Sequence, residues 1–224
     1  MNLAIVGCGM VANEHLKALK RVNGISVVAL CDKDEETVNR MSKKWNIRSS
    51  YTDYSKMMND QDLSIVSILT PPQAHVPVAL EAIKRGINVV MEKPLTPSSG
   101  EARPLLDALK QSKVKLTVDH TMLFSRAMDG LTSLLRRGEL GEVLGAAIQY
   151  LCTPDDSMAA NQNHWSHILP GGRFGEMLPH PIYAIQAVIG NDLVADRVAT
   201  WKRGKYPWMP HDELKVLFRN EKTT

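Results

Sequence analysis

The sequence is poor in cysteine and has no long apolar run, and each shortage excludes a class of protein. Its three cysteines, Cys8, Cys31 and Cys152, are an odd number without paired spacing, which indicates a reducing compartment rather than a disulfide framework. No CxxC or HExxH spacing is present, so we predict no metal site. The longest apolar runs, such as 65–69, are far too short to span a bilayer. We therefore expect neither a disulfide-rich nor a membrane protein.

Neither sign of charge dominates the chain, and this balance argues against a nucleic-acid partner. Lys and Arg number 27 and Asp and Glu number 24, for a net charge of +3 with both signs mixed along the chain. The sequence opens directly on a strand pattern, so no signal peptide is expected. We expect a cytoplasmic protein of one large or two modest domains, since a domain holds roughly 100–200 residues.

What the sequence does contain is a glycine turn near its start. Four apolar residues at 3–6 lead into Gly7-x-Gly9-x-x-Ala12, and a helical apolar pattern follows at once. Gly7 permits a sharp turn, Gly9 lets the backbone approach a pyrophosphate, and Ala12 lets helix and strand pack closely. The exposed N–H groups at the helix start suit an anion. The pattern is typical of dinucleotide binding, although alone it also fits an ordinary strand-to-helix turn.

An acidic residue follows the second apolar strand where a dinucleotide site needs one. The run 25–31 ends in Asp32, about 20 residues beyond Ala12, and a carboxylate there accepts hydrogen bonds from the ribose hydroxyls of NAD. The same carboxylate repels the 2′-phosphate of NADP. We therefore predict NAD as the cofactor, while the neighbouring Lys33 leaves NADP open.

Apolar strands alternate with amphipathic helices through the first half of the chain. This alternation predicts an α/β fold, with a parallel sheet covered by helices on both faces. Asp34 is expected to cap the second helix. The expected strands are 3–7, 25–31, 64–69, 87–91 and 114–118, with a short strand at 51–53, and the expected helices are 10–22, 34–44, 73–85 and 98–111.

Two loops that follow expected strands carry unusual residues. The first is Thr-Pro-Pro-Gln-Ala-His at 70–75, and the second is Met-Glu-Lys-Pro at 91–94. Because ligands of open α/β sheets bind outside the carboxyl ends of the strands, both loops are placed to meet a cofactor. Taken alone, the first also fits a proline-stiffened turn and the second a surface ion pair. Asp119 and His120 directly follow the strand 114–118, and we expect them to line the cofactor cleft at the same carboxyl edge.

In their order and spacing these motifs resemble the Gfo/Idh/MocA family, which is named for glucose–fructose oxidoreductase and inositol dehydrogenase. The resemblance rests on GxGxxA at the N-terminus, TPPxxH at 70–75, EKP at 92–94, LLRRGELGEV at 134–143, and Gly171-Gly172 followed by His180. It implies a Rossmann-type doubly wound parallel sheet over 1–120 that binds NAD(P). It also implies an α+β domain over 121–224, with a mainly antiparallel open sheet for substrate binding and oligomerisation. Family members usually run on past this length, so we expect an incomplete second sheet and a C-terminally short chain.

The second half of the chain carries a different pattern. We expect a helix at 125–137 ended by Gly138, a strand at 143–152, a helix at 181–188, and strands at 193–201 and 213–218. A long polar loop is expected at 153–172, and loops of that length are usually functional or disordered. It carries His164, Trp165 and His167, which fit either a cover over the nicotinamide or substrate or an apolar plug with two surface histidines. The two histidines are also spaced like metal ligands, although no carboxylate or cysteine accompanies them.

The resemblance also implies the chemistry of the site. Lys93 of EKP matches the family's lysine beside the nicotinamide and the substrate hydroxyl, where an ammonium stabilises a developing alkoxide. His180 matches the proton-transferring histidine, and an unperturbed pKa of about 6.5 suits that role. The family pattern Asp-x-x-x-His-x-x-Asp is here Glu176-x-x-x-His180-x-x-Tyr183. Glu176 replaces Asp with a longer reach, whereas Tyr183 offers a hydroxyl in place of a charge.

The predicted function is an NAD-dependent oxidoreductase that acts on CH–OH groups, transferring hydride between nicotinamide and a sugar, cyclitol or related polyhydroxylated substrate. The alternatives are a non-catalytic nucleotide-binding or regulatory protein and a nicotinamide-dependent imine or enone reductase. The expected catalytic residues are Lys93 and His180. The expected cofactor-binding residues are Gly7, Cys8, Gly9, Met10, Val11, Ala12, Asp32, Thr70, Pro71, His75, Glu92 and Lys93. The expected substrate-binding residues are Lys93, His120, Trp165, Arg173, Glu176 and His180. A homo-oligomer formed through the C-terminal sheet is also expected.

Overall fold

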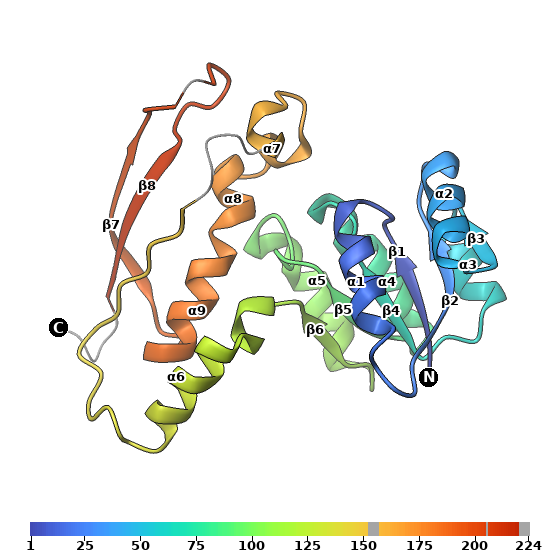
Figure 1. Cartoon of the computed structure of the whole chain (residues 1–224), viewed down its shortest axis with the longest axis horizontal. Coiled ribbons are helices and arrows are strands. Elements are labelled where there is room, and N and C mark those ends of the chain that lie inside the picture. The colour runs from blue at the N-terminus through green and yellow to red at the C-terminus, as the bar shows by residue number, and fades with distance from the viewer. Residues whose placement is uncertain (152–156, 205, 220–224) are drawn as a thin grey trace. The chain divides into compact units, whose positions relative to one another are not determined.

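The N-terminal apolar run lies at the centre of a parallel sheet. The computed structural model describes residues 1–151, 157–204 and 206–219, and its main sheet has the strand order β3-β2-β1-β4-β5-β6 (Figure 1). Every neighbouring pair in this sheet is parallel, so the strands end at one common edge. The strands are β1 (Asn2–Val6), β2 (Ser26–Cys31), β3 (Ser49–Tyr51), β4 (Ile65–Ile68), β5 (Asn88–Met91) and β6 (Leu116–Val118).

The chain divides into two compact units, Met1–Asp119 and His120–Thr224, and each is described by itself. The first unit contains the parallel sheet and the helices that follow its strands. These helices are α1 (Met10–Leu19), α2 (Glu35–Trp45), α3 (Tyr54–Asp60), the 3-10 helix η1 (Pro72–Ala74), α4 (His75–Lys84) and α5 (Ser99–Lys110). Of the helices that the structure describes, none has both the length and the apolar content needed to cross a lipid bilayer.

Alternate side chains of β1 enter two separate apolar cores. Leu3 and Ile5 pack with residues of α1 and α2, whereas Ala4 and Val6 pack with residues of α3, α4 and α5. Both sets are almost completely buried. A strand that buries both faces is typical of a parallel sheet covered by helices on its two sides. The predicted doubly wound α/β architecture is confirmed.

The expected elements of this unit are present, with shifted ends. The helix expected at 10–22 ends at Leu19, and the strand expected at 114–118 begins at Leu116. The short strand expected at 51–53 is instead Ser49–Tyr51, because Asp53 caps α3. Its side chain accepts a hydrogen bond from the Lys56 N–H at 2.9 Å.

Asp34 caps α2, as the sequence predicts. The Thr37 side chain donates to its carboxylate at 2.9 Å, and the backbone N–H groups of Thr37 and Glu36 donate to it at 3.4 and 3.1 Å. These hydrogen bonds, chiefly those from Thr37, lower the pKa of the Asp34 carboxyl. The cap fixes the start of α2 directly after the end of β2, where Asp32 lies.

The second unit combines short helices with an antiparallel hairpin. Its helix α6 ends just before Gly138, whose φ of 71° suits glycine, and its last two strands pair antiparallel, as predicted. The elements are η2 (Thr121–Phe124), α6 (Arg126–Arg136), α7 (Ser157–Ala160), η3 (Trp165–Ile168), α8 (Arg173–Met177), α9 (Pro179–Ile189), β7 (Val194–Trp201) and β8 (Glu213–Arg219).

Two expectations for the second unit are wrong, and a third element is present with shifted ends. Residues 143–151 of the strand expected at 143–152 form no strand, while Cys152 lies outside the described residues. A strand needs a ladder partner, and β7 and β8 pair with each other, so Leu144 and Leu151 stay 82% and 79% exposed. The loop expected at 153–172 contains α7 and η3 in its described part, from 157 on. The helix expected at 181–188 begins at Pro179. Proline is tolerated there because N–H groups in the first turn of a helix have no acceptor within the helix, so the N–H that proline lacks is not needed.

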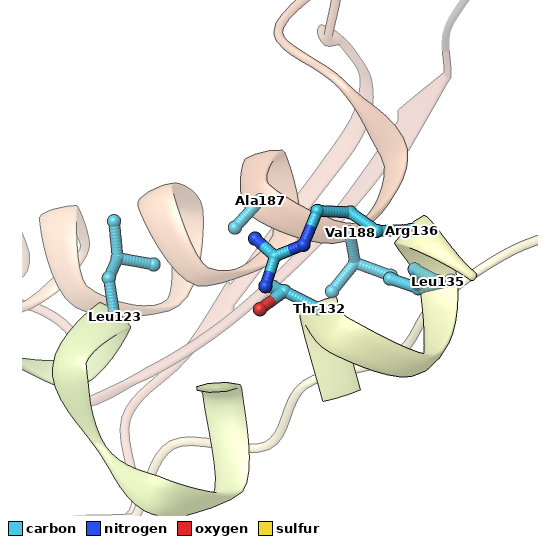
Figure 2. A pocket seen from close by; sticks show the side chains of 6 residues that line it. All are labelled: Leu123, Thr132, Leu135, Arg136, Ala187 and Val188. Carbon is cyan, nitrogen blue, oxygen red and sulfur yellow. The ribbon is translucent and has the colours of Figure 1, made fainter. Parts of the chain in front are cut away.

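A groove of about 470 Å³ lies between η2, α6 and α9 in the second unit. Figure 2 shows the guanidinium of Arg136 beside the apolar side chains of this groove. The lining residues are Leu123, Thr132, Leu135, Arg136, Ala187 and Val188. None of the predicted substrate-binding residues belongs to this set.

Candidate active site

The turn between β1 and α1 has a shape that requires glycine at position 7. Gly7 has a φ of 98°, and a Cβ at this position would lie 2.6 Å from the carbonyl carbon of Leu69 and 2.8 Å from the amide nitrogen of Thr70. A Cβ built on Gly9 meets nothing within 4 Å among the described residues. Gly7 therefore serves the turn itself, while Gly9 keeps the backbone open to a ligand.

The N-terminus of α1 is open to an anion. Gly9 is its N-cap residue and supplies no side-chain hydrogen bond, and the first turn contains no acidic residue. The N–H groups and the positive end of the helix dipole suit a phosphate at this point. Met10 and Val11 are 69% and 42% exposed, whereas Ala12 is fully buried beneath them. The backbone of the turn is therefore accessible to a ligand, whereas the small side chain of Ala12 packs in the core.

A groove of about 390 Å³ begins at the glycine turn and continues along α2. Its two cationic side chains, Arg40 and Lys44, suit an anionic ligand. The lining residues are Cys8, Gly9, Met10, Asn13, Thr37, Arg40, Met41 and Lys44. An open helix N-terminus beside such a groove fits the pyrophosphate and the adenosine end of a dinucleotide.

The Asp32 carboxylate fastens the glycine turn to the end of β2. One oxygen accepts the Cys8 N–H at 2.7 Å, and the other accepts the Asp34 N–H at 3.0 Å. A carboxylate has about four lone-pair sites, so two further hydrogen bonds from ribose hydroxyls can be accepted. Asp32 therefore lies where the sequence predicts the ribose-binding acid.

The two cysteines beside this site are packing residues. Cys8 and Cys31 are free thiols, 3% and 2% exposed, and burial raises the pKa of each to about 12. Thiols with such pKa values are neutral at physiological pH and are poor nucleophiles. Both side chains are therefore small residues buried in the core.

His75 is completely buried between the two loops that follow β4 and β5. Its Nε2 lies 2.9 Å from the Thr70 carbonyl oxygen, and its Nδ1 lies 3.0 Å from that of Pro94 and 3.3 Å from that of Leu95. Burial lowers the pKa of this ring. The side chain is 0% exposed and has no surface for a cofactor to touch. We therefore assign His75 to joining the loops, in place of the predicted contact with the cofactor.

The other predicted residues of the first loop differ in exposure. Pro71 is exposed and is the N-cap residue of η1. The hydroxyl of Thr70 is buried, with no hydrogen-bond partner among the described residues. The carbonyl of Thr70 is the group that His75 contacts, so the backbone of this loop is fixed next to Gly7.

The Glu-Lys-Pro loop leaves β5 at the carboxyl edge of the sheet. The Glu92 N–H donates to the Ile68 carbonyl of β4 at 2.9 Å, and the Lys93 N–H donates to the Glu92 carboxylate at 3.1 Å. The Lys93–Pro94 peptide bond is cis. The loop that carries Lys93 is thus tied to β4 by its backbone and to His75 by the carbonyl of Pro94.

A histidine that sequence reasoning missed lies beside this loop. His15 of α1 has its Nε2 3.2 Å from a carboxylate oxygen of Asp119 and 3.4 Å from one of Glu92. Burial lowers its pKa, but the hydrogen bonds and charges of the two carboxylates outweigh burial and raise the pKa to about 9. One nitrogen or oxygen atom from each of the three side chains lies within 4.8 Å of the other two, a grouping that could also hold a metal ion. The sequence could have predicted this proximity, because α1 starts, and β5 and β6 end, at the same carboxyl edge of the sheet.

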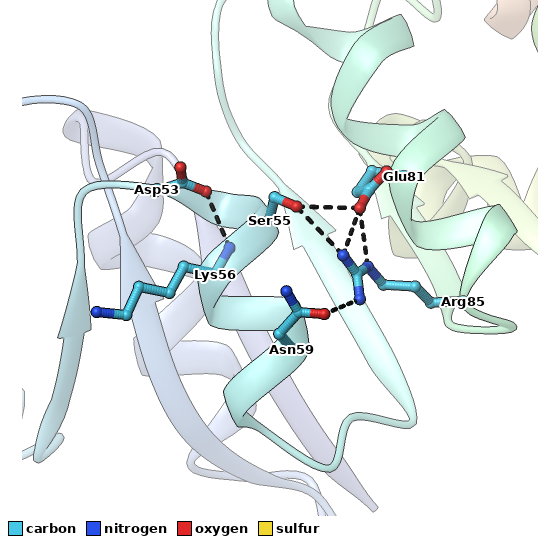
Figure 3. Close-up of polar contacts among 6 residues, drawn as sticks. All are labelled: Asp53, Ser55, Lys56, Asn59, Glu81 and Arg85. Carbon is cyan, nitrogen blue, oxygen red and sulfur yellow. Dashed lines mark hydrogen bonds and ion pairs between the residues drawn. The ribbon is translucent and has the colours of Figure 1, made fainter.

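A second polar cluster of this unit, between α3 and α4, is structural. Glu81 accepts hydrogen bonds at 3.0 Å from both Ser55 and the Nε of Arg85, and Arg85 also donates to Ser55 at 3.2 Å and to Asn59 (Figure 3). The bonds from Arg85 and Ser55 lower the pKa of the Glu81 carboxyl. These side chains satisfy one another and join two helices.

In the second unit, His180 lies in a small group of aromatic side chains. Its Nδ1 is 2.8 Å from the Tyr183 hydroxyl oxygen, which also accepts the Met122 N–H at 3.3 Å. The His120 ring stacks on Tyr183 with centroids 4.2 Å apart, and the Tyr150 ring lies parallel to His180 at 5.7 Å. When the hydroxyl donates to Nδ1, the neutral ring carries its proton on Nε2; when Nδ1–H donates, Nε2 is a base. Tyr183 therefore orients His180 through a hydrogen bond, at the position where the family pattern has Asp.

The other predicted substrate residues of this unit are engaged within it. Arg173 and Glu176 are 8% and 7% exposed and form a buried ion pair at the start of α8. The α8 and α9 helices are separate, so Glu176 and His180 lie on different helices. Trp165 begins η3 and packs at a tilt against His164, with ring centroids 5.0 Å apart.

The model of the Gfo/Idh/MocA oxidoreductase family, with an NAD-binding Rossmann fold, matches residues 1–120. The chain belongs to this family. The predicted resemblance is therefore confirmed: this Gfo/Idh/MocA chain is a member of a family of NAD-dependent oxidoreductases, and its first unit is an NAD-binding domain. The individual roles predicted for its site residues stay predictions.

Relatives extend the similarity beyond the first unit. The chain is 30% identical over 229 aligned positions to "Oxidoreductase P35" of Formosa agariphila, covering 98% of this chain and 70% of that protein. It is 29% identical over 147 positions to inositol 2-dehydrogenase of Salmonella typhimurium, covering 64% of this chain and 44% of the relative. The crystal structure of scyllo-inositol dehydrogenase from Lactobacillus casei, with NAD(H) and scyllo-inositol bound, superposes with a TM-score of 0.87 at 19% identity. That comparison covers 100% of this chain and 67% of the other and shows a shared fold.

Proposed function

We propose that this Gfo/Idh/MocA chain transfers hydride between NAD and a CH–OH group of a sugar, cyclitol or related polyol. The observation that carries the proposal is the placement of Lys93. Its loop leaves the carboxyl edge of the sheet, is tied to β4 and to His75, and belongs to the same unit as the open glycine turn. A cation carried by a loop that is fixed at that edge is suited to stabilise charge on a substrate oxygen.

The geometry of the first unit supports an assignment of the residues that hold the cofactor. The turn at Gly7 and Gly9 and the N-terminus of α1 bind the pyrophosphate, and Asp32 binds the ribose. NAD, when bound, supplies the nicotinamide that accepts or gives a hydride. The carboxylate of Asp32 supports NAD over NADP, since it would repel a 2′-phosphate.

Proton transfer is assigned to His180. An alcohol that loses a hydride must also lose its hydroxyl proton, and a histidine within hydrogen-bond reach can accept that proton. The Tyr183 hydroxyl, 2.8 Å from Nδ1, holds the ring and allows either tautomer, so the same histidine serves oxidation as a base and reduction as an acid. Lys93 holds the charge on the substrate oxygen during the transfer.

The chemical class of the substrate is supported by the named relatives. Inositol 2-dehydrogenase and D-apiose dehydrogenase are named for polyhydroxylated substrates. His120, Trp165, Arg173 and Glu176 are assigned to the substrate side. Because Arg173 and Glu176 already neutralise each other, we expect an uncharged polyol rather than an acidic one.

Two properties of the whole protein are part of the proposal. The β7–β8 hairpin exposes Val194, Val198, Trp201 and Leu217, an apolar surface that supports association with a second copy. Sedimentation velocity checks this association. The lack of paired cysteine spacing supports a cytoplasmic location.

A non-catalytic nucleotide-binding role is the second candidate, favoured by Tyr183 in place of a carboxylate. It predicts NADH binding without turnover of any polyol. An imine or enone reductase would also bind NADH, but alcohols would be inert substrates.

The experiment is an NADH titration, followed by a polyol screen with two variants. Energy transfer from tryptophan to NADH measures binding, and NADH formation measures turnover. We expect Lys93→Met and His180→Ala to lose at least about 100-fold in kcat, the usual size of an acid–base contribution, and His180→Ala to keep an NADH affinity close to that of the wild type. Lys113→Met and His211→Ala, at exposed positions, are the matched controls. Full turnover by both site variants would refute the proposal.

A further inference from the structure

His15 connects three elements at the carboxyl edge of the sheet. It lies in the second turn of α1, and its Nε2 contacts Asp119 after β6 at 3.2 Å and Glu92 after β5 at 3.4 Å. The three side chains are only 16–19% exposed. The function proposed above gives this histidine no part.

The contacts of Glu92 extend from His15 to Lys93. One carboxylate oxygen of Glu92 lies against His15, and the other accepts the backbone N–H of Lys93 at 3.1 Å. The backbone also joins the two carboxylate-bearing loops, because the Asp119 N–H donates to the Met91 carbonyl at 2.8 Å. A displacement of the Glu92 side chain would therefore remove an acceptor from the residue that carries the proposed catalytic ammonium.

We infer that His15, as an imidazolium, is a positioning residue that holds Glu92 and Asp119 together and thereby fixes the loop carrying Lys93. This inference rests on the proposed function for its catalytic consequence, but the charge arrangement is independent of it. Two carboxylates so close together repel each other, and one protonated ring between them offsets that repulsion. A neutral ring, even with its proton on Nε2, carries no charge to offset that repulsion.

The charges that act on His15 come from these two carboxylates. Each favours the protonated ring, and together they overcome its burial. A divalent metal would use the same three side chains, so the two occupants are mutually exclusive. Hydrogen bonds of 3.2 and 3.4 Å from a protonated ring account for the arrangement without any further group.

The first test reads the protonation of His15 directly and needs no substrate. In ¹⁵N-histidine-labelled protein, the seven ring signals are followed by NMR against pH, and the His15 signal is assigned by its loss in His15→Gln. We expect a midpoint near 9 in the wild type, and midpoints shifted toward 6.5 in Glu92→Gln and Asp119→Asn. A wild-type midpoint near 6.5, or one that neither variant moves, would overturn the inference.

The second test compares the effect of a His15 substitution on kcat with its effect on cofactor affinity. We expect His15→Gln to lower kcat at least about tenfold with the NADH Kd within about twofold of wild type, and His15→Lys, which keeps a cation, to recover part of the loss. His211→Gln is the matched control at an exposed histidine. Unchanged kcat in His15→Gln would sink the positioning role. If no polyol is turned over, the proposed function fails, while the NMR titration still decides the charge arrangement.

A metal titration separates the two occupants. Stoichiometric Zn²⁺ or Mn²⁺ should leave the His15 signal in place at neutral pH, because the protonated nitrogen cannot bind a metal. Saturable loss or shift of that signal, abolished by Asp119→Asn, would replace the inference with a metal site.

Discussion

Two glycines two residues apart should respond to the same substitution in opposite ways. At Gly7, alanine would have to adopt a φ of 98°, a conformation that costs a side-chain-bearing residue about 1–3 kcal/mol. Its Cβ would also lie 2.6 Å from the Leu69 backbone, an overpacking that costs about 1–3 kcal/mol. The sum is a loss of about 2–6 kcal/mol in the free energy of unfolding. At about 3 °C per kcal/mol for a chain of this size, Tm should fall by about 6–18 °C.

Gly9→Ala should leave the fold intact and damage the site. The Gly9 φ is −71°, which alanine adopts freely, and its Cβ would meet no described atom within 4 Å. The lower entropy of the unfolded chain should even stabilise the variant by about 0.4–1 kcal/mol. The new methyl group would instead occupy the space in front of the α1 N-terminus. We expect NADH affinity to fall at least about tenfold, or about 1.4 kcal/mol.

Two measurements on the pair of variants decide the matter. Thermal unfolding followed by near-ultraviolet circular dichroism gives Tm, and tryptophan-to-NADH energy transfer gives the Kd. A Gly7→Ala protein as stable as wild type would refute the turn geometry. A Gly9→Ala protein that binds NADH with unchanged affinity would refute the placement of the pyrophosphate at this helix end.

Two other variants test the second unit and the buried titratable groups. Tyr183→Phe should lower kcat about tenfold, since His180 loses the hydrogen bond that orients it. It should also lower the free energy of unfolding by about 1–3 kcal/mol, because the Met122 N–H loses its acceptor. Steady-state kinetics checks the first effect and urea unfolding the second. Unfolding should also become easier at alkaline pH. The raised pKa of His15 contributes stability that is complete below about 6.5 and lost by about 9, and the raised pKa values of Cys8 and Cys31 contribute stability lost from about 9 to 12. Each group changes the free energy of unfolding by up to about 1.4 kcal/mol per pH unit. Urea unfolding measured against pH checks this. The loss of stability between about pH 6.5 and 9 should be smaller in His15→Gln, and an unchanged loss would contradict this account.

The fold of the first unit was predictable because local signals agreed with one another. Gly7, Gly9 and Ala12 follow a short apolar run, and each of the three residue types is needed for a separate steric reason at its position. Strands that bury both faces show as continuous apolar runs, and their alternation with amphipathic helices indicates parallel pairing. The ends of elements were less predictable, since capping by residues such as Asp53 competes with strand pairing.

The second unit was less predictable because its elements depend on partners distant in the chain. The apolar content of 143–151 favours a strand, but a strand forms only where a ladder partner is available, and in this structure β7 pairs with β8. Arg173 and Glu176 are two polar residues in the sequence, and only packing makes them a buried ion pair. Tyr183 was expected to offer a hydroxyl, and the structure supplies the partners of that hydroxyl, His180 and Met122.

The sequence alone determined the residue types of the candidate site, their order, and the family to which the chain belongs, because each motif follows a strand and parallel strands end at one edge. Only the tertiary structure decided which side chains are usable. It buried His75 between two loops, and it brought His15 to Glu92 and Asp119, residues 77 and 104 positions away. Burial and charge pairing depend on distances in space, and a linear pattern contains no such distances.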